Sequence, residues 1–410
     1  MNYRIFPPEE ILETTIARLP LSKSISARAL VLNALTPGGR VPDKSRLADC
    51  NDTHVIAEAL KIRQGNVDIA DCGTAARFLT AFFAATEGVD VIISGTERMN
   101  QRPVGSLVDA LCQLGAQIEY CGTEGCLPLH ICGCRLNGGE VSLNASASSQ
   151  FASALAMIGP TMREPLRINL GGEIASMPYL TMTLRMLENR GVRAEIAGYT
   201  VEVDATPCRD IKIECEPDWS AAGYWYAIAA VTAGWVTIPG LKRNSLQGDK
   251  ILAEIGERFG VLTEFTDKGA ELSATPDLYS RLDLDLSDNP DLAPMLAVVG
   301  CMVNMPYIFT GVANLRHKES DRINAIMEEL FRCGWVLRSD GNTLEWEGTI
   351  VPVGEMPVFS SRGDHRMAMA LAVISQWIPG IVIRNAEAVA KSYPGFWDDL
   401  RDAGFILQEV

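Results

Sequence analysis

The sequence predicts an α/β protein of two lobes, each built from three repeats of one unit. Three observations predict this architecture. A polar loop followed by a small apolar helix and an Ile/Val-rich strand recurs six times, and an amphipathic segment that ends at glycine recurs five times. The chain has 410 residues, of which 47% are apolar, and a single hydrophobic core rarely grows beyond about 250 to 300 residues.

The first recurring segment is an inward-facing helix with the strand that follows it. Its copies are KSISARALVLNAL, DCGTAARFLTAFFAATEGVDVIISG, SSQFASALAMIGPTMREPLRINLGG, DWSAAGYWYAIAAVTAGWVTIPG, NPDLAPMLAVVGCMVNMPYIFTG and GDHRMAMALAVISQWIPGIVIRN. Residues 219–241 and 292–315 carry no charge, but Gly, Asn or Pro interrupts each of them midway. A buried helix followed by a buried strand therefore fits these two stretches better than a membrane span.

The second recurring segment is an exposed helix that stops at glycine. It appears in SLVDALCQLGA, TLRMLENRGV, ILAEIGERFGV, IMEELFRCGW and WDDLRDAGF, with Gly115, Gly191, Gly260, Gly334 and Gly404 in the position of C-terminal caps. The residues after these glycines alternate between apolar and polar, as half-buried strands and hairpins do. Each repeat is thus expected to contain strand, loop, buried helix, strand, exposed helix and strand pair.

The two ends of this pattern set the expected lobes. The first repeat is shortened, and the last one stops at FILQEV, so strand material from residues 3–18 is expected to complete it. The N-terminal lobe is then residues 20–214, and the C-terminal lobe combines residues 1–19 with 215–410. The active site is expected in the cleft between these lobes.

Composition limits the classes of ligand. With 36 Lys+Arg against 51 Asp+Glu the net charge is −15, which opposes binding of nucleic acid or an anionic membrane. An anionic ligand would need a focused basic pocket. The eleven cysteines form no CxxC pair, and no metal constellation, GxGxxG loop or P-loop is apparent, so we expect no metal and no cofactor. Met1-Asn2-Tyr3 opens no apolar signal segment, and reduced thiols fit a cytoplasmic protein.

Cations gather where the recurring helices begin, and helix N-termini favour phosphate and carboxylate groups. These cations are Lys23, Arg28, Arg77 and Arg366 at the inward helices, and Arg102, Lys318, Arg322 and Lys391 at the neighbouring helices or loops. Each has a plainer interpretation, since a lone cation at a helix start is usually a solvated surface residue. The same holds for Asp291 as a helix cap, His365 as a structural histidine, and the acidic residues of HKESDR as partners within one helix.

A set of motifs also carries a family resemblance. LSKSISARAL, DCGTAARF, NQRPVGSLVDAL, ASSQFASAL, SMPYLTMTL, NPDLAPM, NLRHKESDR, GDHRMAMAL and AKSYPGF, in this order, resemble the 5-enolpyruvylshikimate-3-phosphate synthase family. The resemblance implies two inside-out α/β barrels of three βαβαββ repeats each. It also implies a monomer that transfers the enolpyruvyl group of phosphoenolpyruvate to the 5-hydroxyl of shikimate 3-phosphate.

The resemblance assigns residues to the two substrates. Those matching shikimate 3-phosphate contacts are Lys23, Ser24, Arg28, Ser148, Ser149, Gln150, Ser176, Tyr179, Asp291, Asn314 and Lys318. Those matching phosphoenolpyruvate contacts are Lys23, Gly73, Arg102, Gln150, Arg322, Arg366 and Lys391. Asp291 resembles the base at the 5-hydroxyl, Glu319 the group that exchanges a proton with the methyl carbon, and Lys23 a helper in proton transfer.

The chain departs from the family pattern near the second loop. Asp71-Cys72 stands where Asn-Ala is usual, which places a carboxylate near the expected phosphoenolpyruvate subsite, and Phe78 replaces a proline. Two other functions stay open. One is enolpyruvyl transfer to UDP-N-acetylglucosamine, whose family has a reactive Cys that GTERMNQRP lacks. The other is a non-catalytic protein that binds a phosphorylated metabolite.

Overall fold

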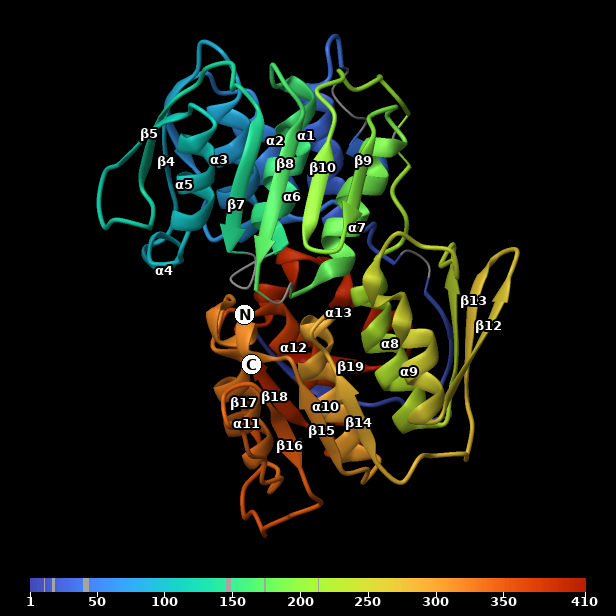
Figure 1. Cartoon of the computed structure of the whole chain (residues 1–410). Coiled ribbons are helices and arrows are strands. Elements are labelled where there is room, and N and C mark those ends of the chain that lie inside the picture. Colours follow the sequence, from blue (N-terminus) through green and yellow to red (C-terminus); the bar gives the residue numbers. More distant parts are fainter. Residues whose placement is uncertain (11, 17–18, 40–43, 145–148, 173–174, 213) are drawn as a thin grey trace. The chain divides into compact units, whose positions relative to one another are not determined.

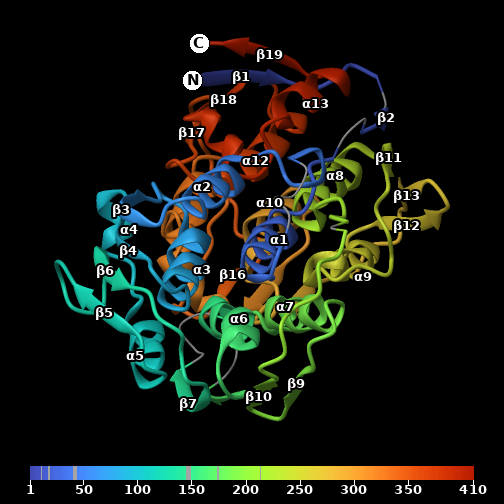
Figure 2. The ribbon, with the colours of Figure 1, turned by 90° about the horizontal axis from the view of Figure 1, so that it is seen from above.

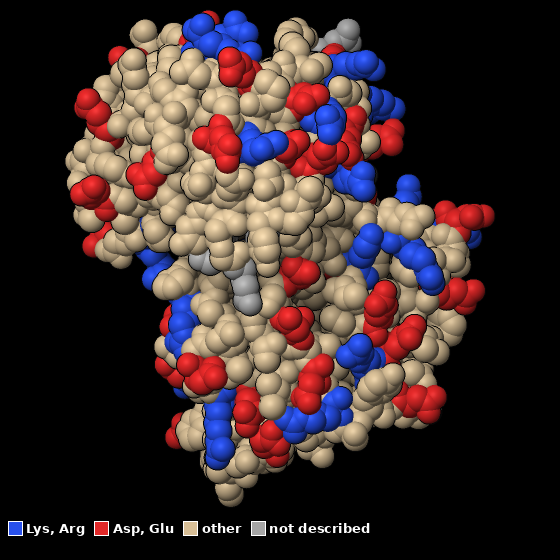
Figure 3. All heavy atoms as spheres, in the orientation of Figure 1, with Lys and Arg blue, Asp and Glu red and all other residues tan. Residues whose placement is uncertain are grey.

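The computed structural model describes the whole chain except residues 11, 17–18, 40–43, 145–148, 173–174 and 213 (Figure 1). It divides into two compact units. The N-terminal unit is Ser22–Cys215, and the C-terminal unit joins Met1–Leu21 to Glu216–Val410. On the face shown in Figure 3, acidic and basic side chains are interspersed on the surface of each unit.

The N-terminal unit contains two four-stranded sheets among its described residues, in the orders β3-β4-β6-β5 and β7-β8-β10-β9. In each sheet the first two strands are parallel and the other pairs are antiparallel. The elements are α1 (Lys23–Leu35), η1 (Lys44–Arg46), α2 (Asn51–Ala59), β3 (Gln64–Asp68), α3 (Gly73–Ala84), β4 (Asp90–Ser94), α4 (Glu97–Asn100), α5 (Gly105–Gln113), β5 (Gln117–Tyr120), β6 (Leu129–Cys132), β7 (Gly139–Asn144), α6 (Ser149–Ile158), η2 (Gly159–Thr161), β8 (Leu166–Gly171), α7 (Met177–Glu188), β9 (Ala194–Ala197) and β10 (Thr200–Val203).

The C-terminal unit contains three sheets among its described residues, in the orders β12-β13-β11-β2, β14-β15-β16 and β17-β18-β1-β19. The elements are β1 (Asn2–Phe6), β2 (Glu13–Thr15), α8 (Trp219–Thr232), β11 (Trp235–Pro239), η3 (Gly248–Ile251), α9 (Leu252–Arg258), β12 (Val261–Thr266), β13 (Gly269–Ala274), β14 (Leu282–Asp285), η4 (Pro290–Leu292), α10 (Ala293–Met302), β15 (Tyr307–Thr310), η5 (Ala313–His317), α11 (Arg322–Phe331), β16 (Leu344–Trp346), β17 (Val358–Ser360), α12 (His365–Ala372), η6 (Val373–Gln376), β18 (Ile381–Arg384), η7 (Ala386–Lys391), α13 (Phe396–Asp402) and β19 (Ile406–Glu409).

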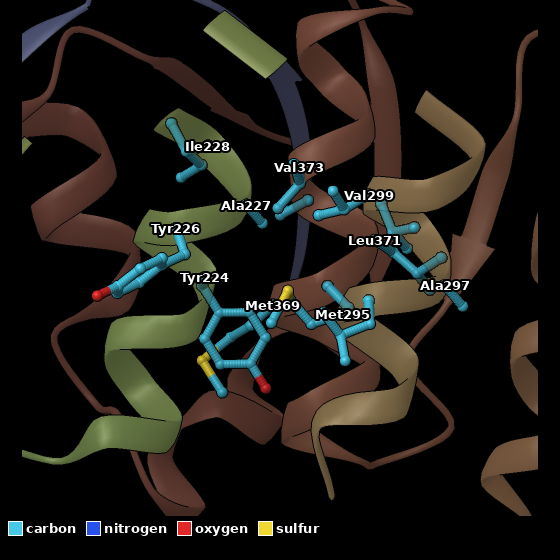
Figure 4. Packing of buried hydrophobic residues seen from close by; sticks show 14 of the residues in the cluster. Tyr224, Tyr226, Ala227, Ile228, Met295, Ala297, Val299, Met369, Leu371 and Val373 are labelled. Carbon is cyan, nitrogen blue, oxygen red and sulfur yellow. The ribbon is translucent and has the colours of Figure 1, made fainter. Parts of the chain in front are cut away.

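The six recurring apolar segments form the helices α1, α3, α6, α8, α10 and α12, as predicted. Their residues are buried on nearly every side, because each helix packs against other helices of its unit. In the N-terminal unit, α1 contacts α2, α3, α6 and α7, which surround it in Figure 2. In the C-terminal unit, α8, α10 and α12 interlock through side chains such as Tyr224, Met295 and Met369 (Figure 4).

The glycines that end the second set of helices are confirmed as left-handed caps. Gly115, Gly191, Gly260, Gly334 and Gly404 have φ angles of 97°, 80°, 84°, 89° and 91°. At Gly334 the space is also closed, because a Cβ there would lie 2.2 Å from the carbonyl oxygen of Val351. Glycine is therefore required at this position for both its backbone conformation and its missing side chain.

The expected fate of the N-terminal strand material is half right. β1 lies between β18 and β19 and pairs antiparallel with both, so it completes the last repeat as predicted. β2 does not join that sheet. It pairs in parallel with β11, through Glu13 opposite Trp235 to Thr15 opposite Thr237, and so completes the sheet of the fourth repeat. The two short strands β1 and β2 therefore belong to different sheets, and the sequence of residues 3–18 did not reveal this division.

The two uncharged stretches are a helix followed by a strand, as predicted. The first forms α8 and β11, and the second forms α10 and β15. None of the helices in the described part of the chain has the length and apolar character needed to cross a bilayer.

We predict that Gly334→Ala lowers the stability of the protein by roughly 1–3 kcal/mol, because the left-handed backbone and the contact with Val351 both oppose a side chain. The measurement is the midpoint of urea unfolding. Gly354→Ala is the matched control, since that glycine has open space around its Cβ position. Equal midpoints for the two variants would contradict the assignment.

Candidate active site

In the N-terminal unit, Lys23 stands at the start of α1, directly after the cap residue Ser22, whose hydroxyl accepts a hydrogen bond from the Ile25 amide at 3.4 Å. The Lys23 ammonium lies 3.0 Å from a carboxylate oxygen of Asp52, near the start of α2. The Asp52 side chain is only 4% exposed. The sequence did not single out Asp52, although its place in the first turn of a helix is a favourable one for a carboxylate.

Arg28 is a buried cation with no carboxylate among its hydrogen-bond partners in the described residues. Its Nε donates to the Thr183 hydroxyl at 2.7 Å, and its other bonds go to the Ser153 hydroxyl and to the carbonyls of Ser24 and Tyr179. The rings of Phe78 and Tyr179 lie 5.2 and 5.9 Å from the guanidinium carbon. Burial lowers the pKa of Arg28 to about 10. A buried positive charge held by neutral groups suits an anionic ligand.

Gly73 begins α3 and allows a guanidinium to approach the helix N-terminus. A Cβ on Gly73 would lie 2.6 Å from Nη1 of Arg102, so any other residue would displace that side chain. The Nε of Arg102 is buried without a hydrogen-bond partner among the described residues. Unsatisfied donors beside a helix N-terminus suit an anion.

Arg77, one of the cations expected at the inner helices, is buried inside α3 and hydrogen-bonds to backbone carbonyls. It is 4% exposed, and it donates to the carbonyls of Gly73 and Pro103 at 2.9 and 3.3 Å. The sequence placed Arg77 one helical turn inside α3, where the side chain points back along the helix rather than past its end. Arg77 therefore supports the loop that carries Gly73 and the segment after Arg102.

Gln150 connects two of the helix starts, because its amide nitrogen donates to the Thr74 hydroxyl at 3.2 Å. It follows Ser149, the buried first residue of α6. Ser176 precedes α7 in a left-handed conformation with φ 60°, and Tyr179 lies in the first turn. Ser148 lies outside the described residues.

In the C-terminal unit, Asp291 is bound by three cations. Its Oδ1 lies 2.7 Å from Nη1 of Arg322 and 3.2 Å from Nζ of Lys318, and its Oδ2 lies 3.2 Å from Nη2 of Arg366. Burial alone would raise the pKa of Asp291, but Arg366, Lys318 and Arg322 outweigh it and hold the pKa of this carboxyl well below its usual range. For Lys318, burial is the largest effect and lowers the pKa despite Asp291.

Arg322 is the centre of this group. Its side chain is 1% exposed and contacts three carboxylates, those of Asp291, Glu319 and Asp364, each with a contact of 2.7 Å. The pairing of Glu319 with Arg322 is the local i,i+3 contact expected of HKESDR, but Asp291 and Asp364 come from other elements. Burial would lower the pKa of Arg322, and the three carboxylates together raise it instead.

Asp364 is a functional candidate that the sequence analysis missed. Its carboxylate has no exposure, accepts from Arg322 and from the Ser320 hydroxyl, and caps α12 through the Arg366 amide at 3.0 Å. Asp364 thus holds both the side chain of Arg322 and the backbone of Arg366, two of the arginines expected to bind ligand. Its position directly before His365-Arg366, at the start of a predicted inward helix, was the available signal, since aspartate is a preferred N-cap.

Arg366 reaches a further polar group at the start of α8. Its Nη2 lies 3.4 Å from the Ser220 hydroxyl, which in turn hydrogen-bonds to Asp249. Asn289 donates to the other oxygen of Asp249 at 2.9 Å. Burial raises the pKa of Asp249, against the attraction of Arg366. The starts of α8 and α12 and the segment before η4 are therefore joined by one polar network.

The remaining expected residues have separate surroundings. Asn314 has its Oδ1 buried without a hydrogen-bond partner among the described residues, and Lys391 is 4% exposed at the end of η7. His365 is 3% exposed with its Nδ1 3.8 Å from Asp364. Ser24 is half-buried, whereas Asp71 is exposed beside Cys72, whose sulfur caps α3 by accepting from the Ala75 amide at 3.3 Å.

Each unit thus places cations at the starts of its inner helices. The C-terminal unit also groups three carboxylates around one of these cations. The fold and these side chains together define an α/β protein with groups of buried cations, of the kind that suit small anionic ligands.

Comparison with known proteins identifies the family. The family model for EPSP synthase (3-phosphoshikimate 1-carboxyvinyltransferase) matches residues 63–400. A 3-phosphoshikimate 1-carboxyvinyltransferase of Bacteroides fragilis is 44% identical, over 99% of this chain and 98% of the relative, and one of Methanospirillum hungatei is 33% identical over 93% and 94%. The EPSP synthase structure from Acinetobacter baumannii matches the fold with a TM-score of 0.77, 20% identity and full coverage of both chains. The chain belongs to the EPSP synthase family.

We predict that Asp291→Asn destabilises the protein at neutral pH by about 1–3 kcal/mol, because three cations lose their shared carboxylate. The native pKa lies below the ordinary value of 3.8, so this stabilisation is present above pH 3.8 and is lost as the pH falls further. The free energy of urea unfolding should therefore be lower for Asp291→Asn than for the unsubstituted chain, and this difference should shrink below about pH 4.

Asp398→Asn is the matched control, because Asp398 pairs with Arg401 on the surface and its side chain is 78% exposed. It should change the midpoint little at any pH. A deficit of Asp291→Asn that stays constant down to acid pH would show that the charge of Asp291 is not what stabilises the group.

Proposed function

We infer that the chain transfers the enolpyruvyl group of phosphoenolpyruvate to the 5-hydroxyl of shikimate 3-phosphate and releases phosphate, a step of aromatic amino acid synthesis through the shikimate pathway. Family membership over nearly the whole chain supports the reaction. The observation that carries the mechanism is the contact of Asp291 and Glu319 with one buried arginine, because the reaction needs two carboxylates among cations.

The proposed reaction has two stages. In the first stage, Asp291 takes the proton of the 5-hydroxyl, and the hydroxyl oxygen bonds to C2 of phosphoenolpyruvate. Glu319 gives a proton to C3, which becomes a methyl group. Glu319 then removes a proton from that methyl, the C2–C3 double bond re-forms, and the bond from C2 to the phosphate oxygen breaks. The proton that Asp291 took from the hydroxyl leaves with the released phosphate. Lys23 assists the proton transfers. Each stage is general acid–base catalysis, and no electrons are gained or lost overall.

Substrate binding would activate Asp291. With three cations around it, this carboxylate is a very weak base. Phosphate and carboxylate groups of the substrates compete for the same cations, because guanidinium groups bind both bidentately. As Lys318, Arg322 and Arg366 turn toward the substrates, the pKa of Asp291 rises, and the base becomes stronger when the substrates are present.

We further propose the division of residues between the substrates that the resemblance implies. Lys23, Ser24, Arg28, Ser148, Ser149, Gln150, Ser176, Tyr179, Asp291, Asn314 and Lys318 bind shikimate 3-phosphate, and Lys23, Gly73, Arg102, Gln150, Arg322, Arg366 and Lys391 bind phosphoenolpyruvate. The buried Nε of Arg102 and Oδ1 of Asn314, which have no partner in the described part of the chain, support this division. We also propose a cytoplasmic monomer.

We predict that phosphate release requires phosphoenolpyruvate and shikimate 3-phosphate together, and that Lys23→Ala lowers its rate at least about 100-fold. The assay measures phosphate with each substrate omitted in turn. Lys61→Ala is the control, because Lys61 is an exposed lysine that pairs with Glu58. Phosphate release with UDP-N-acetylglucosamine in place of shikimate 3-phosphate would show the other enolpyruvyl transfer instead. Substrate binding without phosphate release would indicate a non-catalytic binding protein.

We predict that Asp52→Asn lowers kcat about 10- to 100-fold, because the buried carboxylate positions the Lys23 ammonium and small displacements of a catalytic group are costly. Asp49→Asn is the control, since the side chain of Asp49 is 89% exposed and pairs with His54. If Asp52 acts by positioning Lys23, the Lys23→Ala variant and the double variant that combines Lys23→Ala with Asp52→Asn should have the same kcat. An additive loss in the double variant would show that Asp52 acts independently of Lys23.

A further inference from the structure

The outer face of the sheet β3-β4-β6-β5 carries a group of metal-binding side chains that the proposed reaction does not use. Asp90 begins β4, and His130 and Cys132 lie two residues apart on β6. In the described part of the chain, these three residues bring an oxygen, a ring nitrogen and a sulfur within 4.8 Å of one another. Figure 2 shows the strands of this sheet side by side at the edge of the N-terminal unit.

Strand register and alternation produce this group. Asp90 is paired with Cys132 across β4 and β6, and Glu119 of β5 is paired with His130. Successive residues of a strand point to opposite faces, and Val91 and Ile131 fill the buried face. Asp90, His130, Cys132 and Glu119 therefore share the other face, where Asp90 and Glu119 are exposed and His130 and Cys132 are half-buried.

The distances are close to those of a tetrahedral metal site. The Nε2 of His130 lies 2.7 Å from Oδ1 of Asp90 and 3.8 Å from Sγ of Cys132. Ligands at about 2.0–2.3 Å from a tetrahedral zinc are roughly 3.3–3.7 Å apart. The nitrogen–sulfur distance exceeds this range by only about 0.1 Å, and the nitrogen–oxygen distance must open by roughly 0.6 Å. Rotation of the exposed Asp90 side chain can supply that movement.

Glu119 adds a second feature of zinc sites. Its Oε2 lies 4.0 Å from Nδ1 of His130, whereas Asp90 and Cys132 contact the other ring nitrogen, Nε2. A histidine that binds a metal through one ring nitrogen usually donates its other N–H to a carboxylate, which fixes the ring and its tautomer. Asp90 and Glu119 thus lie at opposite nitrogens of His130, one in the position of a ligand and the other in that of an orienting acceptor.

We propose that Asp90, His130 and Cys132 bind one Zn²⁺ ion on this face, with water as the fourth ligand and Glu119 orienting His130. Thiolate, imidazole and carboxylate form a ligand set that zinc accepts, whereas Mg²⁺ and Ca²⁺ require oxygen ligands. The Cys132 thiol gives up its proton to solvent when the metal binds. The site stands apart from the proposed catalysis, because Asp90 is at the opposite end of β4 from the loop that leads to Arg102.

Cobalt binding tests the ligands directly. The chelator-treated full-length chain is titrated with Co²⁺, which replaces zinc in tetrahedral sites and gives a thiolate-to-cobalt absorption band when a cysteine is a ligand. We expect the band to saturate at one equivalent and Zn²⁺ to abolish it. Cys132→Ser should lose the band, and His130→Ala should lower Co²⁺ affinity at least about 10-fold. Both should keep the phosphate-release activity of the unsubstituted chain.

Cys134→Ser is the matched control, because Cys134 lies two residues beyond the end of β6 and its sulfur contacts the Gly115 carbonyl at 3.4 Å. It should bind Co²⁺ like the unsubstituted chain. Glu119→Gln should keep the band and lower the affinity about 10- to 100-fold. A band that survives Cys132→Ser, a band lost in Cys134→Ser, or no band at one equivalent would overturn the proposal.

Thermal unfolding provides a second measurement that does not depend on cobalt. Binding to the native state raises Tm by mass action, so excess Zn²⁺ should raise the Tm of the unsubstituted chain and of Cys134→Ser. It should leave the Tm of Cys132→Ser unchanged, and circular dichroism without metal checks that each variant folds. If Cys132→Ser does not fold, Asp90→Ala takes its place with the same expectation. An equal rise in Tm for every variant would mean that zinc binds elsewhere.

Discussion

The contact of one buried arginine with three carboxylates organises the C-terminal unit. Arg322 binds Asp291, Glu319 and Asp364 while its own side chain is 1% exposed. Four ionic groups could not be buried separately, because each would lose several kcal/mol of hydration. Together they join η4, the segment before α11 and the start of α12. The geometry of the expected catalytic carboxylates therefore depends on Arg322, and Asp364 anchors Arg322 from the buried side.

The buried arginine of the N-terminal unit has a different kind of partner. Arg28 is equally buried, but its partners are hydroxyls, carbonyls and aromatic faces, so its positive charge is not cancelled by them. Lys23 has a carboxylate partner in Asp52, and the Nε of Arg102, beside the start of α3, has no hydrogen-bond partner among the residues that the structure describes. Arg28 thus keeps a buried charge that its neutral partners do not cancel, whereas Lys318, Arg322 and Arg366 share the carboxylate of Asp291. Focused groups of cations of this kind suit anionic ligands even in a chain with a net charge of −15.

Features repeated along the chain could be predicted from the sequence. The six inner helices and the glycine caps follow from apolar patterning and from backbone conformation, which are local properties. The cations at the helix starts could also be predicted, because their positions follow from where the predicted helices begin. Asp52, Asp364 and the inward direction of Arg77 could not, because side-chain packing between elements decides them. The pairing of β2 with β11 and the meeting of Asp90 with His130 depend on strand register, which residues about 40 or more positions apart do not reveal.

The most direct test of the account is the pKa of Asp291, measured by ¹³C NMR of the aspartate carboxyl carbons, with Asp291→Asn used to assign the signal. We predict a carboxyl that stays ionised to well below pH 3.8 in the free protein and titrates at higher pH once phosphoenolpyruvate and shikimate 3-phosphate are bound. An ordinary pKa in the free protein, or one that falls further on substrate binding, would contradict the claim that substrates release the base from its cations.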